Sequence, residues 1–204
     1  MNDVASDGAL TPERILEAAE DVLRRFGPSK ATVVDVARAL GVSHGSVYRH
    51  FPSKAALRDA VLERWLHRIS DPLESVVRGR EPAPERLRKW MDALMAAKRR
   101  RVLKEPELFA TYGILAADAR EVVKGHVDAL VEQAARIIAD GIKSGAFSVK
   151  DAESAARSVF DATARFHNPR HAAEWSDPGI DAAFEGVWSL IKAALTARLP
   201  GKRG

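Results

Sequence analysis

The residues best suited to chemistry lie between positions 36 and 58, a stretch without a single Asp or Glu. Its basic side chains are Arg38, His44, Arg49, His50, Lys54 and Arg58. A carboxylate aimed at a phosphate would repel it, so a surface that contacts a polyanion needs a face free of acids. The stretch therefore predicts contact with nucleic acid.

Small and hydroxyl side chains stand where this stretch would approach a phosphate. Ser43 is placed to cap a short helix that runs to about Phe51, where Pro52 ends it. The backbone N–H groups of the first helical turn have no partners within the helix. They bind phosphate oxygens well because the helix dipole is positive at this end. Gly45 and Ser46 are small enough to let the helix end come close to a groove.

Two helices before this stretch must hold it in place. The first is predicted to begin at Thr11 as N-cap, to carry an inward apolar stripe as far as Phe26, and to end at Gly27. The second begins with Thr32 as its cap and stops at Gly41. A turn of a few residues then leads into the third helix, so the order is that of a helix-turn-helix.

The rest of the chain also follows helical spacing, and no alternating strand pattern is present. A fourth helix is predicted over residues 53–70, and further helices over residues 84–103, 106–118, 120–144, 151–167 and 179–199. The segment RGREPAPE, residues 78–85, has the composition of a loop. The predicted fold class is therefore all-α, with a domain boundary near residue 70 and a disordered stretch over residues 1–10.

Composition limits the function classes. The chain has 204 residues, 46% of them hydrophobic, and a net charge of +4 that does not by itself announce a nucleic-acid partner. Because Cys is absent, disulfides and thiolate metal sites are excluded. No apolar run approaches the roughly 20 residues that span a bilayer, and the first residues lack the pattern of a secretory signal. We expect a cytoplasmic protein with no membrane partner.

The capped helices and the turn between them belong to one longer segment, TPERILEAAEDVLRRFGPSKATVVDVARALGVSHGSVYRHFPSKAALRDAV. It contains, in order, Ala18-Ala19, Phe26-Gly27, Thr32-Val33, Val36-Ala37, Gly41-Val42-Ser43, Gly45, Val47-Tyr48, His50-Phe51, Ser53-Lys54 and Leu57. With these features, residues 11 to about 66 resemble the N-terminal DNA-binding domain of the TetR/AcrR family of bacterial transcription regulators.

The resemblance implies an N-terminal three-helix helix-turn-helix DNA-binding domain over residues 11–70, which includes the fourth, linking helix. That helix would join a larger helical domain for ligand binding and dimerisation over residues 71–204. The implied partners are double-stranded DNA with a pseudo-palindromic operator, a small-molecule effector of unknown identity, and a second copy of the chain in a homodimer.

For this sequence, the family pattern also implies a division of labour at the DNA. Contacts to the DNA backbone fall to Thr32, Ser43, Tyr48 and Lys54, and base reading falls to His44, Gly45, Ser46 and Arg49. The fork of Arg49 matches the O6 and N7 atoms of guanine. Val34 departs from relatives that carry a polar or basic side chain at that position. Two alternatives stay open, namely that Tyr48 is a packing residue and that Arg58 is a solvated helix residue.

The implied effector pocket would draw on the middle helices. We predict that it is lined by Trp90, Met91, Leu94, Phe109, Tyr112, Phe160, Phe166 and His167. Tyr112 and His167 combine a hydrogen-bonding group with apolar neighbours, so they are the expected polar anchors. The scarcity of charges predicts a largely apolar effector. Aromatic residues at helical spacing are more often plain core than pocket lining, which remains the alternative for each of them.

The last two helices are expected to form the dimer interface. The predicted interface residues are Val159, Phe184, Val187, Trp188, Ile191 and Leu195. The apolar stripe of the last helix could equally be covered by the chain's own core, and the resemblance is what favours the homodimer. Such a dimer would present two reading helices about 34–36 Å apart to a pseudo-palindromic operator.

Two other clusters are given no functional role. The basic residues at positions 98–101 are predicted to form a solvated face near a helix C-terminus. His167 and His171 are separated by Pro169 and have no third ligand beside them, so we predict no metal site and no cofactor.

Taken with the resemblance, these observations predict a sequence-specific DNA-binding transcriptional regulator, a repressor that an effector releases from its operator. They predict no enzyme, because the sequence has no G-x-S-x-G, no H-E-x-x-H, no phosphate loop and no cysteine nucleophile. One alternative is a nonspecific DNA-binding protein, which calls for a more basic surface. The other is an all-α enzyme that uses the C-terminal pocket.

Overall fold

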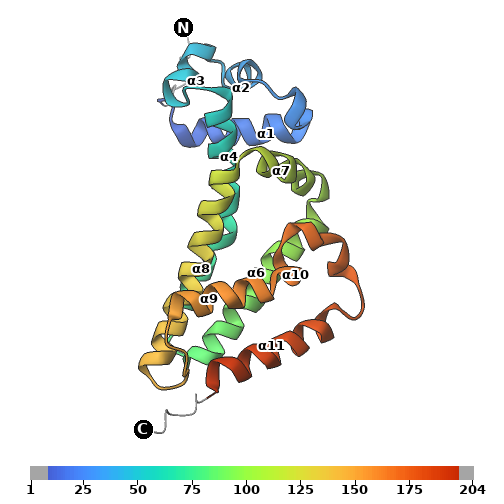
Figure 1. The fold of residues 1–204 in the computed structure, drawn as a ribbon. Helices are drawn as coiled ribbons and strands as arrows, with labels where there is room; N and C mark the ends of the chain where they lie inside the picture. The colour runs from blue at the N-terminus through green and yellow to red at the C-terminus, as the bar shows by residue number, and fades with distance from the viewer. Residues whose placement is uncertain (1–8, 198–204) are drawn as a thin grey trace. The chain divides into compact units, whose positions relative to one another are not determined.

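The computed structural model describes residues 9–197, and within this range every regular element is a helix (Figure 1). The elements are α1 (Pro12–Lys30), α2 (Val33–Leu40), α3 (His44–His50), α4 (Lys54–Ser70), η1 (Asp71–Leu73), α5 (Glu74–Val77), α6 (Ala83–Lys104), α7 (Pro106–Asp118), α8 (Arg120–Lys143), α9 (Ala152–Ala162), α10 (Ala164–His167), η2 (Pro169–Ser176) and α11 (Ile180–Thr196). The predicted all-α class is confirmed. No helix of the described part has both the length and the apolar character needed to cross a membrane.

The chain divides into two compact units. Unit 1 comprises Met1–Trp65 and Glu107–Val122, and unit 2 comprises Leu66–Pro106 and Val123–Gly204. The division differs from the single boundary expected near residue 70, because α7 and the first residues of α8 return to the unit that holds the helix-turn-helix. The predicted disorder of residues 1–10 lies, except for residues 9 and 10, outside the described residues.

In unit 1, the first helix forms as its capping residue predicts. The Thr11 hydroxyl accepts a hydrogen bond from the backbone N–H of Arg14 at 3.3 Å, and Pro12 occupies the first helical turn. Gly27 has a φ of 73°, which kinks the helix where its end was predicted. The prediction that Phe26 continues the inward stripe of α1 is wrong. Phe26 lies just before the kink and is 46% exposed, and the buried stripe ends at Leu23.

The second and third helices are held by local caps. Thr32 and Asp35 form a reciprocal capping box, with Thr32 Oγ1 accepting from the Asp35 N–H at 3.2 Å and Asp35 Oδ2 accepting from the Thr32 N–H at 3.1 Å. Gly41 adopts the left-handed conformation that ends α2. Ser43 caps α3, and the fully buried Val47 anchors α3 to the core of unit 1. The predicted helix-turn-helix is confirmed.

Helix α7 contributes to unit 1 through an aromatic contact. The rings of Trp65 and Tyr112 stack with centroids 4.4 Å apart and planes inclined by 14°. Trp65 lies on the part of α4 that belongs to unit 1, so this stacked pair joins α4 to α7 within the unit.

In unit 2, polar contacts fix α6 against α8. Arg86 Nη2 donates to Asp140 Oδ2 at 2.8 Å, and Trp90 Nε1 donates to Gln133 Oε1 at 2.9 Å. Residue numbers therefore rise along α6 while they fall along α8, so the two helices run antiparallel. The amide of Gln133 also donates to the carbonyl of Ser70 at 3.1 Å, which satisfies both polar groups inside the core.

The helix predicted over residues 151–167 is interrupted. Helix α9 ends at Ala162, and the short α10 starts after Thr163. The buried hydroxyl of Thr163 donates to the carbonyl oxygen of Val159 at 2.8 Å, beside the regular bond from the Thr163 N–H at 3.1 Å, and such a back-bond favours a bend in a helix. Helix α10 packs on α6, and this break brings Phe166 and His167 into the core of unit 2.

Candidate functional site

The predicted DNA-contacting residues gather on the exposed surface of the helix-turn-helix. Thr32 starts α2, residues 43–49 make up the turn and α3, and Lys54 starts α4. All eight predicted residues are exposed except Ser46, which is half-buried. Val47, between them, is fully buried, so α3 is fixed on one side and free on the other. The described structure thus offers one polar, acid-poor face along α3.

Hydrogen bonds within α3 orient its polar side chains. The Ser43 and Ser46 hydroxyls lie 2.9 Å apart, and Ser43 Oγ accepts from the Ser46 N–H at 3.1 Å. Arg49 Nη2 donates to Ser46 Oγ at 3.1 Å. The remaining N–H groups of Arg49 have no partner in the described residues, so this guanidinium is positioned yet still open to an external acceptor.

Tyr48 is 41% exposed and makes its ring contact with another exposed residue, not with the core. Its ring meets that of His44 edge-on, with centroids 6.4 Å apart and planes inclined by 88°. Within residues 9–197 the Tyr48 hydroxyl has no hydrogen-bond partner. This environment does not favour the alternative that Tyr48 is a packing residue.

The hydroxyl of Thr32 is more tightly engaged than the sequence suggests. Besides accepting from the Asp35 N–H, it donates to Asp35 Oδ2 at 2.6 Å. The hydrogen bond from Thr32 lowers the pKa of Asp35, which keeps this carboxylate charged, and Arg38 Nη1 pairs with Asp35 Oδ1 at 3.1 Å. Thr32 would have to give up its bond to Asp35 before it could donate to a phosphate.

The two basic residues of α4 differ in what surrounds them. Lys54 is exposed, and no described acid pairs with it. Arg58 is partly covered and lies 3.6 Å from Asp118 of α7, within unit 1. Lys54 is therefore the one of the two whose charge is free to meet a phosphate.

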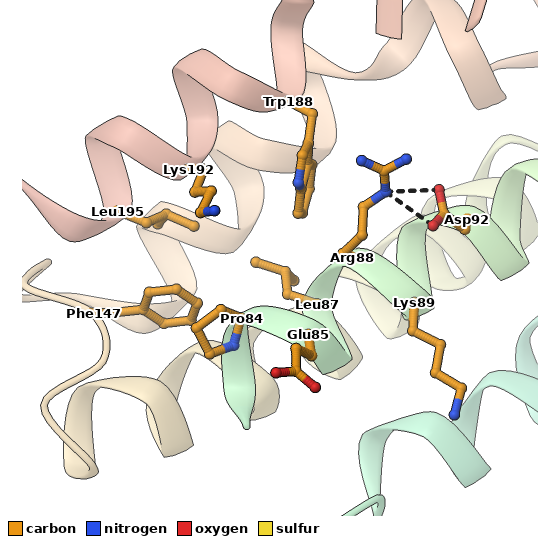
Figure 2. A pocket seen from close by; sticks show the side chains of 10 residues that line it. All are labelled: Pro84, Glu85, Leu87, Arg88, Lys89, Asp92, Phe147, Trp188, Lys192 and Leu195. Carbon is orange, nitrogen blue, oxygen red and sulfur yellow. Dashed lines mark hydrogen bonds and ion pairs between the residues drawn. The ribbon is translucent and has the colours of Figure 1, made fainter. Parts of the chain in front are cut away.

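Unit 2 contains a surface cavity of about 410 Å³ between the start of α6 and the end of α11 (Figure 2). It is lined by Pro84, Glu85, Leu87, Arg88, Lys89, Asp92, Phe147, Trp188, Lys192 and Leu195. Arg88 Nε donates to both oxygens of Asp92 at 3.0 and 2.9 Å, and its guanidinium lies 5.6 Å from the Trp188 ring centroid. None of the eight residues predicted to line the effector pocket belongs to this cavity.

The predicted pocket residues are divided between the two units. Phe109 and Tyr112 belong to unit 1, while Trp90, Met91, Leu94, Phe160, Phe166 and His167 are buried in unit 2. Trp90 is satisfied by Gln133, which is the behaviour of a core residue. His167 differs, because its Nε2 lies 3.1 Å from the Phe160 carbonyl while its Nδ1 has no partner among the described residues.

A cluster of buried basic groups in unit 2 was missed at the sequence level. Lys98, predicted to be solvated, is only 7% exposed, and burial lowers its pKa to about 8. His126 of α8 is 8% exposed, and both of its ring nitrogens lack partners within residues 9–197. Burial first, and then the charges of Lys98 and His67, lower its pKa to about 3. Because three arginines follow Lys98, its sequence context is that of a surface residue. The one signal in the sequence is the position of Lys98, four residues after Leu94 and so on the apolar side of the helix.

The predicted dimer residues are covered by their own chain. Phe184, Trp188, Ile191 and Leu195 of α11 and Val159 of α9 are all buried, and only Val187 is partly exposed. The less buried face of α11 carries small residues around Leu190; this set, called the small-residue stripe, consists of Ala183, Gly186, Val187, Leu190, Ala193 and Ala194, of which Ala183 and Val187 are half-buried. Leu190, at its centre, is 74% exposed. In the single chain the large residues predicted for the interface are thus already covered, and this stripe is the less covered side of α11.

Two family models match the chain. The model described as "Bacterial regulatory proteins, tetR family" matches residues 15–61, and the model described as "Tetracyclin repressor-like, C-terminal domain" matches residues 83–188. The second match alone covers more than half of the 204 residues. The first match includes α2 and α3 complete, and the second runs from the start of α6 into α11.

Known proteins agree with these matches. The HTH-type transcriptional regulator UidR of Escherichia coli strain K12 is 31% identical over 80 residues, which are 37% of this chain and 41% of that protein. The match thus spans about two fifths of this relative's length.

Two solved structures share the fold. A protein with unknown function from Rhodococcus sp. RHA1 is 24% identical, with 96% of this chain and 100% of that chain covered and a TM-score of 0.67. FadR of Thermus thermophilus, a TetR family transcriptional repressor in complex with lauroyl-CoA, is 20% identical, with 95% and 100% covered and a TM-score of 0.62.

Proposed function

Because this chain belongs to the TetR family of bacterial regulatory proteins, we propose that it regulates transcription by binding a specific operator in double-stranded DNA. The observation that carries the proposal is the exposed face of α3, where Arg49 is positioned by Ser46 and keeps unpaired donors. Such a helix, with small residues at its first turn, fits the major groove.

The side chains of this face divide into two roles. Arg49 reads a guanine through its fork, with His44, Gly45 and Ser46 beside it at the base edges. Ser43, Tyr48 and Lys54 contact phosphates and fix the orientation of α3 on the duplex. Thr32 contributes as the cap of α2, and its phosphate contact is the weakest of the set because Asp35 holds its hydroxyl.

The proposed regulator is a homodimer. The small-residue stripe of α11 is apolar and open, and small side chains let two helices approach closely. Burying Leu190 against a second copy would remove a large apolar side chain from water. A two-fold dimer matches a pseudo-palindromic operator.

A small molecule controls the proposed repressor. The Thermus thermophilus neighbour was solved with lauroyl-CoA, which supports a ligand-binding role for this chain, and we place that role in unit 2. An effector that binds better when the two reading helices are wrongly spaced lowers the affinity for DNA by its differential affinity for the two states. We assign the chain to no enzyme class, because its family acts through DNA binding.

The test compares two variants on an operator isolated by selection from random duplexes. Arg49→Ala should cost about 1–3 kcal/mol on the operator and relax the preference at one base position. Lys54→Ala should weaken binding to the operator and to a scrambled duplex alike, and should reduce the salt slope by about 1. Lys150→Ala, which removes an exposed lysine of unit 2, serves as the control for net charge. Equal losses of Arg49→Ala on both duplexes would refute base reading by this residue.

A further inference from the structure

Lys98 of α6 and His126 of α8 are both buried in unit 2. Trp90 and Gln133, about two turns away along the same two helices, are joined by a hydrogen bond. The charge of Lys98 acts on His126 and on His167 of α10, so the three basic groups are neighbours within unit 2.

These groups are buried without the partners that buried charges need. Lys98 has no hydrogen-bond or ion-pair partner among the described residues, and neither does either ring nitrogen of His126. The other charged or titratable group that acts on His126 is His67, which is also basic. Buried cations in proteins are almost always paired or hydrogen-bonded, so the ammonium of Lys98 leaves an unfilled requirement for negative charge, and the uncharged ring of His126 leaves an unpaired N–H donor.

The donors of the cluster suit a carboxylate. The ammonium of Lys98 offers three N–H donors, and a neutral His126 offers one more. Nε2 of His167 lies 3.1 Å from the Phe160 carbonyl and therefore carries the ring proton. Nδ1 of His167 is then an acceptor and cannot donate to an anion, so the donors that remain are those of Lys98 and His126. A carboxylate accepts through two oxygens and would satisfy Lys98 and His126 together.

The surroundings of the cluster are apolar. Leu94 lies one turn before Lys98 on α6, and Leu130 lies one turn after His126 on α8; both are fully buried. The Phe160 ring lies 4.3 Å from the ring of His167. From these positions we infer that unit 2 binds a small carboxylic acid with an apolar body, its carboxylate held by Lys98 and His126 in the core. This inference rests on the proposed effector control and names the chemical class of the effector.

The surface cavity of Figure 2 is a weaker candidate for an anion. Arg88 is already paired with Asp92 and Glu185, and Lys89 is paired with Glu81. Because Arg88 and Lys89 already have acidic partners, a bound anion would add little electrostatic stabilisation at either residue. Lys192 is exposed to water, where a single ion pair contributes little.

The experiment measures binding of matched acids and amides to the purified full chain by calorimetry. The probes are octanoate, decanoate and benzoate, each compared with its primary amide. We expect the acid that fits best to bind at least about tenfold more tightly than its amide, and Lys98→Met to weaken this acid about 100-fold. His126→Gln should also weaken it, and it provides a second variant that keeps one hydrogen-bond donor. Lys192→Met, which removes an exposed lysine from the surface cavity, should bind like the wild type.

Three outcomes would overturn the inference. It is wrong if none of the three acids binds, if the amides bind as well as the acids, or if Lys98→Met binds like the wild type. Loss of binding in Lys192→Met alone would place the anion in the surface cavity instead. Operator binding without any probe is measured on the same samples, so a failure of DNA binding refutes the proposed function separately. Acid binding that leaves operator affinity unchanged would refute effector control while upholding the site.

Discussion

Replacing Lys98 with Met should make the ligand-free protein more stable. Burial lowers the pKa of Lys98 from its ordinary 10.5 to about 8, because the charged ammonium is held in the core without a counterion. The difference corresponds to about 3 kcal/mol, at about 1.4 kcal/mol for each pKa unit. Met has a similar length and no charge, so Lys98→Met should raise the free energy of unfolding at pH 7 by about that amount.

The pH dependence provides an internal check on this magnitude. Below pH 8 the ammonium is charged in both the native and the unfolded chain, so the full cost is present. Between pH 8 and 10.5 the native protein loses the proton while the unfolded chain keeps it. The wild type should therefore gain stability across this window, and its difference from Lys98→Met should shrink toward zero.

Urea unfolding followed by circular dichroism at pH 7 and pH 10 measures both quantities for the wild type and the variant. A variant that is less stable than the wild type at pH 7 would show that Lys98 has a stabilising partner. A difference that stays constant up to pH 10 would show that the ammonium is not the source of the effect. Either result would refute the buried-cation account of unit 2.

Three further predictions concern packing, assembly and acid stability. Gly141→Ala should destabilise the protein by about 1–3 kcal/mol in urea unfolding, because its Cβ would collide with the buried Phe147 ring, whereas Gly125→Ala, with open space around it, should not destabilise. Leu190→Glu should convert a dimer to monomer in light scattering without lowering monomer stability, and the proposed interface is wrong if the dimer persists. Burial lowers the pKa of His126 and His167 to about 3, so stability should fall as the pH drops from 6.5 toward 3, and His126→Gln should flatten that fall in pH-dependent unfolding curves.

Features that depend on a few adjacent residues were predictable from the sequence. Thr11, Thr32 and Ser43 cap their helices as expected, since a cap needs only a hydroxyl and the next turn of backbone. Gly27 marks the kink in α1 and Gly41 the end of α2 for a similar reason, because their positive φ values favour glycine. The surface of α3 followed from these local signals.

Features that depend on what a helix packs against were not predictable in this way. Helix α11 has two apolar faces, and periodicity does not reveal that its own chain buries Phe184 and Trp188 while Leu190 stays exposed. Lys98 stands in a run of arginines, so composition favoured water where the structure has a core. The break at Thr163 left the helical spacing intact, and the side-chain hydrogen bond that Thr163 makes there has no counterpart in the pattern of apolar residues.

The most direct test of the central claim is selection of random duplexes by the purified wild-type chain at near-physiological salt, with the mass of the selected complex recorded. The account predicts enrichment of one pseudo-palindromic sequence bound by an even number of chains. If no sequence is enriched, and the selected duplexes bind no more tightly than unselected random duplexes, a sequence-reading role for α3 is contradicted.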